Sequence, residues 1–373
     1  MKFITSKSAL LSAATLIGKC IPASSTVLPI IEKFLFDLND GTLTISGTDL
    51  QTSMITALSV ESNDKGKIAI PAQILLDVLK SLVEQPLSFA FDTDSLAIEI
   101  TAGDGVYKLI GLNGEDFPKI AVIQDGGSVE LPSTILSEAI NQTLYAVGND
   151  ELRPAMTGVY CKLSPDFLTF VSTDATRLVR YRRIDIKSET EASFIIPKKA
   201  LSLLKQALPP DGTMVAIEHN KTSAIFKLGS YTLVCRLIDE KYPDYQAVLP
   251  NNNVNKLTVD RLAFLSSLQR VAIFANKTTH QVRFDIAGNE LKVSSEDIDF
   301  SNEAHERMHC QYDGEDITIG FNAKLLIEVL KNIGTHEISI SMSTANRATL
   351  VTPVQEVTEE DLLVMLMPMM LHN

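Results

Sequence analysis

An internal repeat is the feature of this sequence that most restricts its fold. An alternating, strand-like motif closes on an aspartate three times, at Asp49, Asp174 and Asp297, with spacings of 125 and 123 residues. Three helical segments keep the same period and each ends in Leu-Lys; they begin at Ile70, Ile196 and Gly320. A third marker pairs Pro118 with Pro243, again 125 residues apart. Repeats of fixed period indicate one structural unit used several times.

Each repeat is predicted to be an α+β domain. The segments between the helices alternate in polarity and meet at short turns rich in Gly, Asn and Asp, which favours antiparallel sheets with helices on one face. We expect each repeat to open with an apolar helix, at 8–19, 133–147 and 259–276, and to contain a second one at 71–83, 197–208 and 321–332. In the first helix, the apolar face comprises Leu10, Ala14, Ile17 and Ile21. Linkers at 124–127 and 251–254 place three domains at 1–125, 126–252 and 253–373.

Charge is distributed unevenly along the chain. The formal net charge is −13, which disfavours a generic basic nucleic-acid binder. The six predicted helices, with the fifth counted through Lys277, nevertheless carry +6 together, which leaves −19 for strands and loops. Two interpretations stay open: the lysines form an ordinary solvated helix face, or the helices line a modestly positive surface that faces a phosphate backbone.

No apolar run reaches the roughly 18 residues that span a bilayer. Residues 1–20 imitate a secretory signal, but Lys19 stands before Cys20 where a lipoprotein site needs a small residue. Four widely spaced cysteines without a CxxC pair are typical of reduced core residues. We therefore expect a cytoplasmic protein without a membrane segment.

The string His305-Glu306-Arg307-Met308-His309 has the spacing of a zinc protease motif. Its chemistry requires a helix, whereas the repeat register predicts a strand, on which residues four apart are separated by about 13 Å. A metal-dependent hydrolase using His305, Glu306 and His309 remains the alternative from another class. We expect no enzyme activity, no cofactor and no metal.

The C-terminal segment combines an acidic stretch, 356–361, with an apolar one, 362–371. Residues 362–366 are predicted to form the last strand. Residues 367–371 would then lie at the surface, where methionines suit an adaptable partner-binding site; a buried tail is the alternative.

These residues resemble the bacterial sliding clamp family, the beta subunits of DNA polymerase III, over essentially the whole chain. The matching strings are Met1-Lys2-Phe3, Leu28-Pro29-Ile30, Asp116-Phe117-Pro118, Thr173-Asp174-Ala175-Thr176-Arg177-Leu178, Ile196-Pro197-Lys198-Lys199, Tyr242-Pro243-Asp244-Tyr245, Val248-Leu249-Pro250 and Met367-Pro368-Met369-Met370-Leu371.

The resemblance implies a head-to-tail homodimer that closes into a ring around duplex DNA without reading its sequence. It also implies docking of the DNA polymerase III catalytic subunit, a clamp-loader complex and other replication or repair proteins through a peptide pocket between the second and third domains. A monomeric three-domain scaffold without DNA is a further alternative.

The family's functional positions carry over as three sets. The peptide pocket comprises Met156, Thr173, Ala175, Thr176, Arg177, Leu178, Pro243, Val248, Leu366, Met367, Pro368, Met369 and Leu371. The DNA-facing set comprises Lys80, Arg153, Lys198, Lys199, Lys205, Arg270, Lys277 and Lys331. The dimer interface comprises Tyr107 and Leu109 on one subunit and Ile273 and Phe274 on the other. Departures from the family pattern at Ser25, Ala175-Thr176 and Met370 bear on DNA contacts and on peptide preference.

Overall fold

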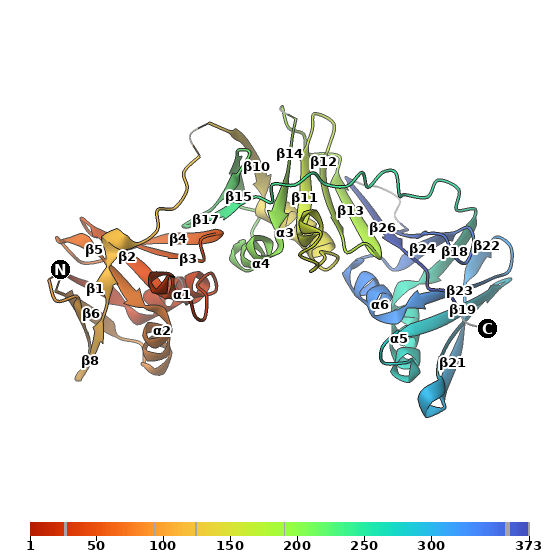
Figure 1. Ribbon diagram of the computed structural model, residues 1–373, viewed down its shortest axis with the longest axis horizontal. Coiled ribbons are helices and arrows are strands. Elements are labelled where there is room, and N and C mark those ends of the chain that lie inside the picture. The colour runs from red at the N-terminus through yellow and green to blue at the C-terminus, as the bar shows by residue number, and fades with distance from the viewer. Residues whose placement is uncertain (26–27, 93, 124, 190, 355–358, 372–373) are drawn as a thin grey trace. The chain divides into compact units, whose positions relative to one another are not determined.

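The computed structural model describes residues 1–25, 28–92, 94–123, 125–189, 191–354 and 359–371. One order of elements occurs three times: a strand, a helix, four strands, a second helix and three strands (Figure 1). The first repeat comprises β1 (Lys2–Ser6), α1 (Lys7–Gly18), β2 (Lys33–Asn39), β3 (Thr42–Thr48), β4 (Thr52–Ser59), β5 (Lys65–Pro71), α2 (Ala72–Ser81), β6 (Pro86–Phe91), β7 (Ala97–Ala102) and β8 (Gly105–Ile110).

The second and third repeats follow the same order. The second comprises β10 (Gly127–Pro132), α3 (Ser133–Leu144), β11 (Gly158–Leu163), β12 (Leu168–Thr173), β13 (Arg177–Arg183), β14 (Ala192–Pro197), α4 (Lys198–Ala207), β15 (Met214–His219), β16 (Ser223–Leu228) and β17 (Tyr231–Arg236). The third comprises β18 (Asn255–Asp260), α5 (Arg261–Val271), β19 (Gln281–Ala287), β20 (Glu290–Asp297), β21 (Asn302–His309), β23 (Ile317–Asn322), α6 (Ala323–Asn332), β24 (Glu337–Met342), β25 (Thr349–Pro353) and β26 (Glu360–Leu366). Two short extra strands are β9 (Leu112–Asn113) and β22 (Gln311–Asp313).

The repeat is thus confirmed, but the prediction that each copy opens with a helix was wrong. A strand of five or six residues comes first in every copy and runs directly into the helix. The same junction occurs at the second helix, where Pro71 and Pro197 are the last strand residues rather than the first helical ones. Pro71 has φ −53° and ψ 113°, outside the helical region. A proline is tolerated there because the strand needs no further backbone donor at its end.

The described chain divides into two compact units, each described here by itself. Unit 1 comprises residues 1–137 and 199–237, and unit 2 comprises residues 138–198 and 238–373. Unit 1 holds a four-stranded sheet of order β1-β6-β7-β8 and a nine-stranded sheet of order β10-β15-β16-β17-β4-β3-β2-β5-β9. Unit 2 holds a nine-stranded sheet of order β14-β11-β12-β13-β26-β25-β24-β18-β22 and a four-stranded sheet of order β21-β20-β19-β23. Every strand pairing among the described residues is antiparallel, as predicted.

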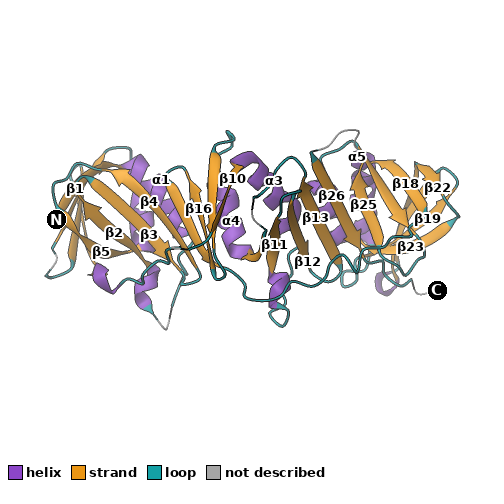
Figure 2. Cartoon of the chain, turned by 90° about the horizontal axis from the view of Figure 1, so that it is seen from above, coloured by secondary structure: helices purple, strands orange, loops and turns teal. Residues whose placement is uncertain are grey.

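Helices pack in pairs against one face of the strands within each unit. In unit 1, α1 contacts α2 and the strands β3 and β4, and in unit 2, α5 contacts α6 and the strands β20 and β21. Figure 2 shows α1 behind the strands of its sheet and α5 behind those of its own. Three of the four residues predicted on the apolar face of α1 are buried, namely Leu10, Ala14 and Ile17. The fourth, Ile21, lies beyond the end of the helix and is half-buried.

Aromatic packing fills the core between the two sheets of unit 1. Phe3 on β1 stacks on Phe89 of β6, with ring centroids 4.7 Å apart, and Phe36 on β2 approaches both rings. All three side chains are essentially inaccessible to water. Truncating one such phenylalanine to alanine costs roughly 3–5 kcal/mol, so these contacts fix the first strand, β1, in place.

In unit 2, β26 joins the second repeat to the third by pairing with β13. The register matches Arg177 with Leu366 and Arg183 with Glu360. Cross-strand ion pairs reinforce it, because Arg183 contacts Glu360 at 2.6 Å and Arg180 contacts Asp361 at 2.6 Å. The predicted last strand at 362–366 is therefore confirmed, with an acidic start that neutralises the arginines of β13. Residues 356–358 of the acidic stretch lie outside the described residues.

Two further sequence predictions concern cysteines and membranes. Cys20, Cys161, Cys235 and Cys310 are buried and unpaired, as predicted. No helix in the described part of the chain is long and apolar enough to cross a membrane.

Candidate functional site

A tight loop between β12 and β13 organises the surface at which most of the predicted pocket residues meet. Asp174 Oδ1 accepts hydrogen bonds from the backbone N–H groups of Thr176 and Arg177, both at 2.9 Å. Thr173 Oγ1 donates to the Arg177 carbonyl at 2.6 Å and accepts from the Ala175 N–H at 3.1 Å. Ala175 takes a left-handed conformation, with φ of 74°. Side-chain hydrogen bonds of this kind stabilise a turn locally, so the loop is fixed before any partner binds.

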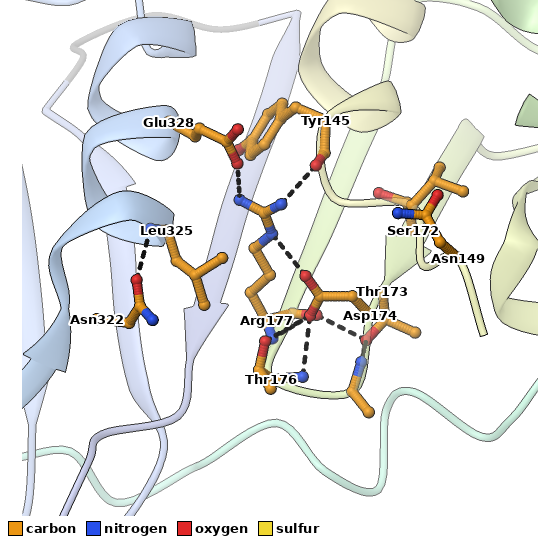
Figure 3. A network of polar contacts seen from close by, with 12 residues as sticks. Tyr145, Asn149, Ser172, Thr173, Asp174, Thr176, Arg177, Asn322, Leu325 and Glu328 are labelled. Carbon is orange, nitrogen blue, oxygen red and sulfur yellow. Dashed lines mark hydrogen bonds and ion pairs between the residues drawn. The ribbon is translucent and has the colours of Figure 1, made fainter. Parts of the chain in front are cut away.

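Arg177 is the buried centre of a polar network (Figure 3). Its guanidinium donates to Asp174 Oδ2 at 3.0 Å, to Glu328 Oε2 on α6 at 2.6 Å and to the Tyr145 carbonyl at 2.6 Å. Its carbon Cζ lies 5.3 Å from the centre of the Tyr145 ring. Burial raises the pKa of the Tyr145 phenol, so the ring faces the cation in its neutral form. Arg177 therefore ties the Asp174 loop of the second repeat to α6 of the third.

The C-terminal tail lies beside this loop. Met367, the first residue after β26, donates its N–H to the Thr176 carbonyl at 2.9 Å and is 43% exposed. Leu366 and Leu178 are buried at the neighbouring positions of the paired strands. The surface position predicted for this segment is thus observed for Met367 and for Met370, which is 71% exposed.

A buried apolar cluster packs beneath the Asp174 loop and the start of the tail. Leu178 and Met365 pack with Tyr242 and Tyr245, and Leu249 covers the cluster in part. Pro243 and Val248 come from the same segment and are exposed. Met156 lies close to the loop, because the N–H of Gly148 donates hydrogen bonds both to the Met156 carbonyl and to the Thr173 carbonyl. We call the set formed by Met156, the 173–178 loop, Pro243, Val248 and Met367 the Met367 surface.

The end of the tail lies elsewhere. Met369 pairs with Gly320 at the edge of β23, and Gln281 Nε2 donates to the Met370 carbonyl at 3.1 Å. Leu371 lines a cleft of about 620 Å³ on the four-stranded sheet of unit 2, together with Arg283, Lys292 and His305. The structure therefore places Leu371 in a polar cleft, while Met367 adjoins the Asp174 loop.

The eight predicted DNA-facing cations lie on or next to helices, but three are already ion-paired. Arg153 contacts Asp150 at 2.8 Å, Lys199 contacts Asp49, and Arg270 contacts Glu306 at 2.6 Å. Lys198 donates to Asn149 at 2.8 Å. Within the described residues, no ion pair is made by the remaining four, which are all exposed: Lys80, Lys205, Lys277 and Lys331.

The predicted interface residues lie at open sheet edges or next to them. Tyr107 and Leu109 are on β8, which pairs only with β7 in the described part of unit 1. Ile273 and Phe274 lie just after α5, with 64% and 40% of their surfaces exposed. Both α5 and this segment contact β21, the edge strand of the four-stranded sheet of unit 2.

The HExxH string lies on a strand, as predicted. His305 and His309 are on β21 opposite Ser294 and Glu290, and Glu306 accepts two hydrogen bonds from Arg270. This ion pair holds the pKa of Glu306 below its usual value. No cluster of three metal-binding side chains occurs among the described residues.

Sequence reasoning missed Glu328 and Tyr145. Glu328 is 151 positions away from Arg177, and one acid on a helix surface carries no signal of such a partner. Asp174, three residues before Arg177, already supplies an anion close by in the sequence, so nothing in the sequence indicated two further partners.

Comparisons with known protein families find matches along nearly the whole chain. Three family models of the DNA polymerase III beta subunit match in order: the N-terminal domain at residues 1–121, the central domain at 130–244 and the C-terminal domain at 246–370. The Beta sliding clamp of Pseudomonas putida is 28% identical over 373 residues and is covered completely, as is this chain. That of Synechococcus elongatus is 26% identical over 364 residues, covering 95% of this chain and 96% of the relative.

Solved structures give the same result. A crystal structure of the sliding clamp of Pseudomonas aeruginosa bound to griselimycin is 26% identical, with a TM-score of 0.93 and full coverage of both chains. The corresponding structure from Bartonella birtlesii, also bound to griselimycin, is 27% identical with a TM-score of 0.92. These matches confirm the resemblance and the clamp fold of three α+β domains that it implies. The chain therefore belongs to the family of DNA polymerase III beta subunits, the bacterial sliding clamps.

Proposed function

We propose that this sliding clamp acts as a head-to-tail homodimeric ring that encircles duplex DNA and tethers the DNA polymerase III catalytic subunit. A clamp loader would place it on DNA, and the ring would hold by topology, without base readout, catalysis or a cofactor. Family membership supports this role. We assign the three domains to residues 1–125, 126–252 and 253–373, and the site of action to the cytoplasm.

The observation that carries the ring proposal is the pair of open sheet edges. β8 ends one four-stranded sheet and β21 ends the other, and each presents backbone donors and acceptors. An open edge is prone to pair with another chain. Joining β8 of one copy to β21 of the next would cover both edges, with Tyr107 and Leu109 meeting Ile273 and Phe274.

Sedimentation equilibrium at micromolar concentration tests the ring. We expect a species of about 82 kDa, twice the chain mass of 40.9 kDa. Leu109→Asp, which places a carboxylate on the β8 edge, should shift the population to monomer. A wild-type monomer across this range would refute the dimer.

The DNA-facing helices would contact the phosphate backbone weakly. Replacing Lys198, Lys199 and Lys205 with glutamate should shorten the time for which the protein stays on closed circular DNA. It should also make this retention less dependent on salt concentration. A matched control places glutamates at the exposed residues Lys65, Lys187 and Lys256, which changes the net charge equally. Equal loss in both triple variants would contradict a localised DNA-facing surface.

We further propose that the Met367 surface docks partner peptides; Leu366 lies buried beneath it, and Pro368, Met369 and Leu371 would extend the site along the tail toward β23. Exposed apolar side chains over a fixed loop and a buried aromatic cluster suit an extended segment with apolar anchors. Deleting residues 367–371 should weaken binding of the polymerase catalytic subunit at least tenfold in surface plasmon resonance, while the dimer mass stays unchanged. Unaltered binding would refute this assignment.

A further inference from the structure

Unit 1 contains a loop built like the Asp174 loop of unit 2. Asp49, between β3 and β4, accepts hydrogen bonds through Oδ1 from the N–H groups of Gln51 and Thr52, at 2.9 and 2.6 Å. Thr48 Oγ1 donates to the Thr52 carbonyl and accepts from the Leu50 N–H. Leu50 has a φ of 74°, the same value as Ala175. The two loops therefore correspond residue by residue.

The strand beside the loop corresponds as well. Cys235 on β17 pairs with Thr52, as Leu366 on β26 pairs with Arg177. The next residue, Arg236, donates its N–H to the Gln51 carbonyl at 2.8 Å, which repeats the bond from Met367 to Thr176. Arg236 thus occupies the position in unit 1 that Met367 occupies in unit 2.

A groove of about 370 Å³ lies at this junction in unit 1. Its lining residues are Thr48, Leu50, Gln51, Ser53, Pro118, Lys119, Ile120, Ala121, Ser223, Val234, Cys235 and Arg236. This volume falls within the range of roughly 300–1,000 Å³ that is usual for ligand sites. We call it the Leu50 groove. The segment from Pro118 lines it, and Pro118 stands 125 residues before Pro243 of the Met367 surface.

The chemistry of the Leu50 groove differs from that of the Met367 surface. Leu50 is 45% exposed in a left-handed conformation that a branched side chain rarely adopts. Beside it, Ile120 and Val234 supply apolar walls. The charged lining residues are both cations, Lys119 and Arg236, which are exposed and make no ion pair within the described residues. The chain as a whole carries a net charge of −13, so these two cations form a local positive patch at the groove. A positive patch favours binding of an acidic ligand.

We propose that the Leu50 groove is a second docking site, which binds an extended acidic peptide segment of a partner protein. An apolar side chain of the peptide packs against Leu50, Ile120 and Val234. A neighbouring carboxylate accepts hydrogen bonds from Arg236 and Lys119. The inference rests on the proposed function, in which partner peptides dock at the Met367 surface. It adds a second, separate groove that binds peptides of a different sequence.

Methyl NMR on the full-length protein tests the two sites separately. The probes are amidated hexapeptides with two leucines and either two glutamates or two lysines, and the reporters are the methyl groups of Ile120, Val234, Met367 and Met370. We expect the glutamate peptides, and not the lysine peptides, to shift Ile120 and Val234. Arg236→Gln keeps the backbone bond to Gln51 and should weaken this binding about tenfold, since a charge-assisted hydrogen bond is lost. The control Lys256→Gln removes an exposed cation of unit 2 and should leave it unchanged.

Each outcome bears on one site. Shifts confined to Met367 and Met370 would overturn the second site while leaving docking at the Met367 surface intact. Shifts at Ile120 and Val234 that persist in Arg236→Gln, or that the lysine peptides also cause, would overturn the acidic specificity. Shifts at Ile120 and Val234 without any at the methionines would support the Leu50 groove and argue against the Met367 surface. No shift at either site with millimolar peptide would overturn the second site.

Discussion

The ion pair between Arg177 and Glu328 allows a quantitative test of how the second and third repeats are held together. Glu328→Gln keeps the side-chain length but removes the charge from one of three guanidinium partners. A hydrogen bond to a charged group contributes about 1.5–3 kcal/mol. The Glu328 side chain is 51% exposed, and water screens it, so we expect a loss below that range, about 1 kcal/mol.

Arg177→Met removes all three hydrogen bonds and should cost about 3 kcal/mol, because it leaves the Tyr145 carbonyl without this donor. If the ion pair is the link, the double variant should lose about 1 kcal/mol less than the sum of the single variants.

Urea unfolding followed through the Met365 methyl resonance measures the free energy of unfolding of unit 2 for each variant. A local probe is needed because a chain with two compact units need not unfold in one step, and the sequence has no tryptophan. Asp150→Asn, in an exposed pair with Arg153, is the matched control and should leave unfolding unchanged. Additivity of Arg177→Met and Glu328→Gln within about 0.3 kcal/mol would refute the coupling.

Three other predictions concern the tail, the pH dependence and the thiols. Met367→Asp should weaken binding of the polymerase catalytic subunit more than Met370→Asp, because Met367 adjoins the Asp174 loop whereas Met370 accepts a hydrogen bond from Gln281 of β19; equal effects in surface plasmon resonance would contradict this arrangement. Burial lowers the pKa of His219 below its usual value of 6.5, so the unfolded chain binds the proton more readily. Stability should therefore fall as pH decreases below about 6.5, and His219→Gln should reduce this slope in thermal unfolding. Burial raises the pKa of Cys20 and of Cys235 to about 12, so Ellman's reagent at pH 8 should label neither in the native protein and both in urea; rapid native labelling would show that these cores open.

The repeat made the fold largely predictable. Three markers with one period implied that whatever element one copy contained, the others would contain too, and the common order of elements confirms this. The opening strands were missed because each has only five or six residues and runs into an apolar helix without a turn. Val259 illustrates the problem: its apolar side chain fits the helical pattern, but its backbone pairs with Ile338 on β24.

The candidate site was predictable only where neighbours in sequence build it. The Asp174 loop satisfies its own hydrogen bonds within four residues, so its position at a strand end was visible in the repeat. Glu328 and Tyr145, which bind Arg177, and Glu306, which binds Arg270, lie far from these arginines in the chain, and a single sequence carries no signal for such contacts. Leu371 shows the same limit, because its direction depends on the bridge between Met369 and Gly320.

The two nine-stranded sheets have a consequence for cutting this protein into fragments. Each sheet is assembled from two successive repeats, through β4 with β17 and through β13 with β26. A fragment cut at residue 125 or 252 would therefore lose the neighbour of a central strand and expose a long apolar edge, which favours aggregation. The sequence is thus built from repeats, whereas each compact unit joins one whole repeat to part of the neighbouring one.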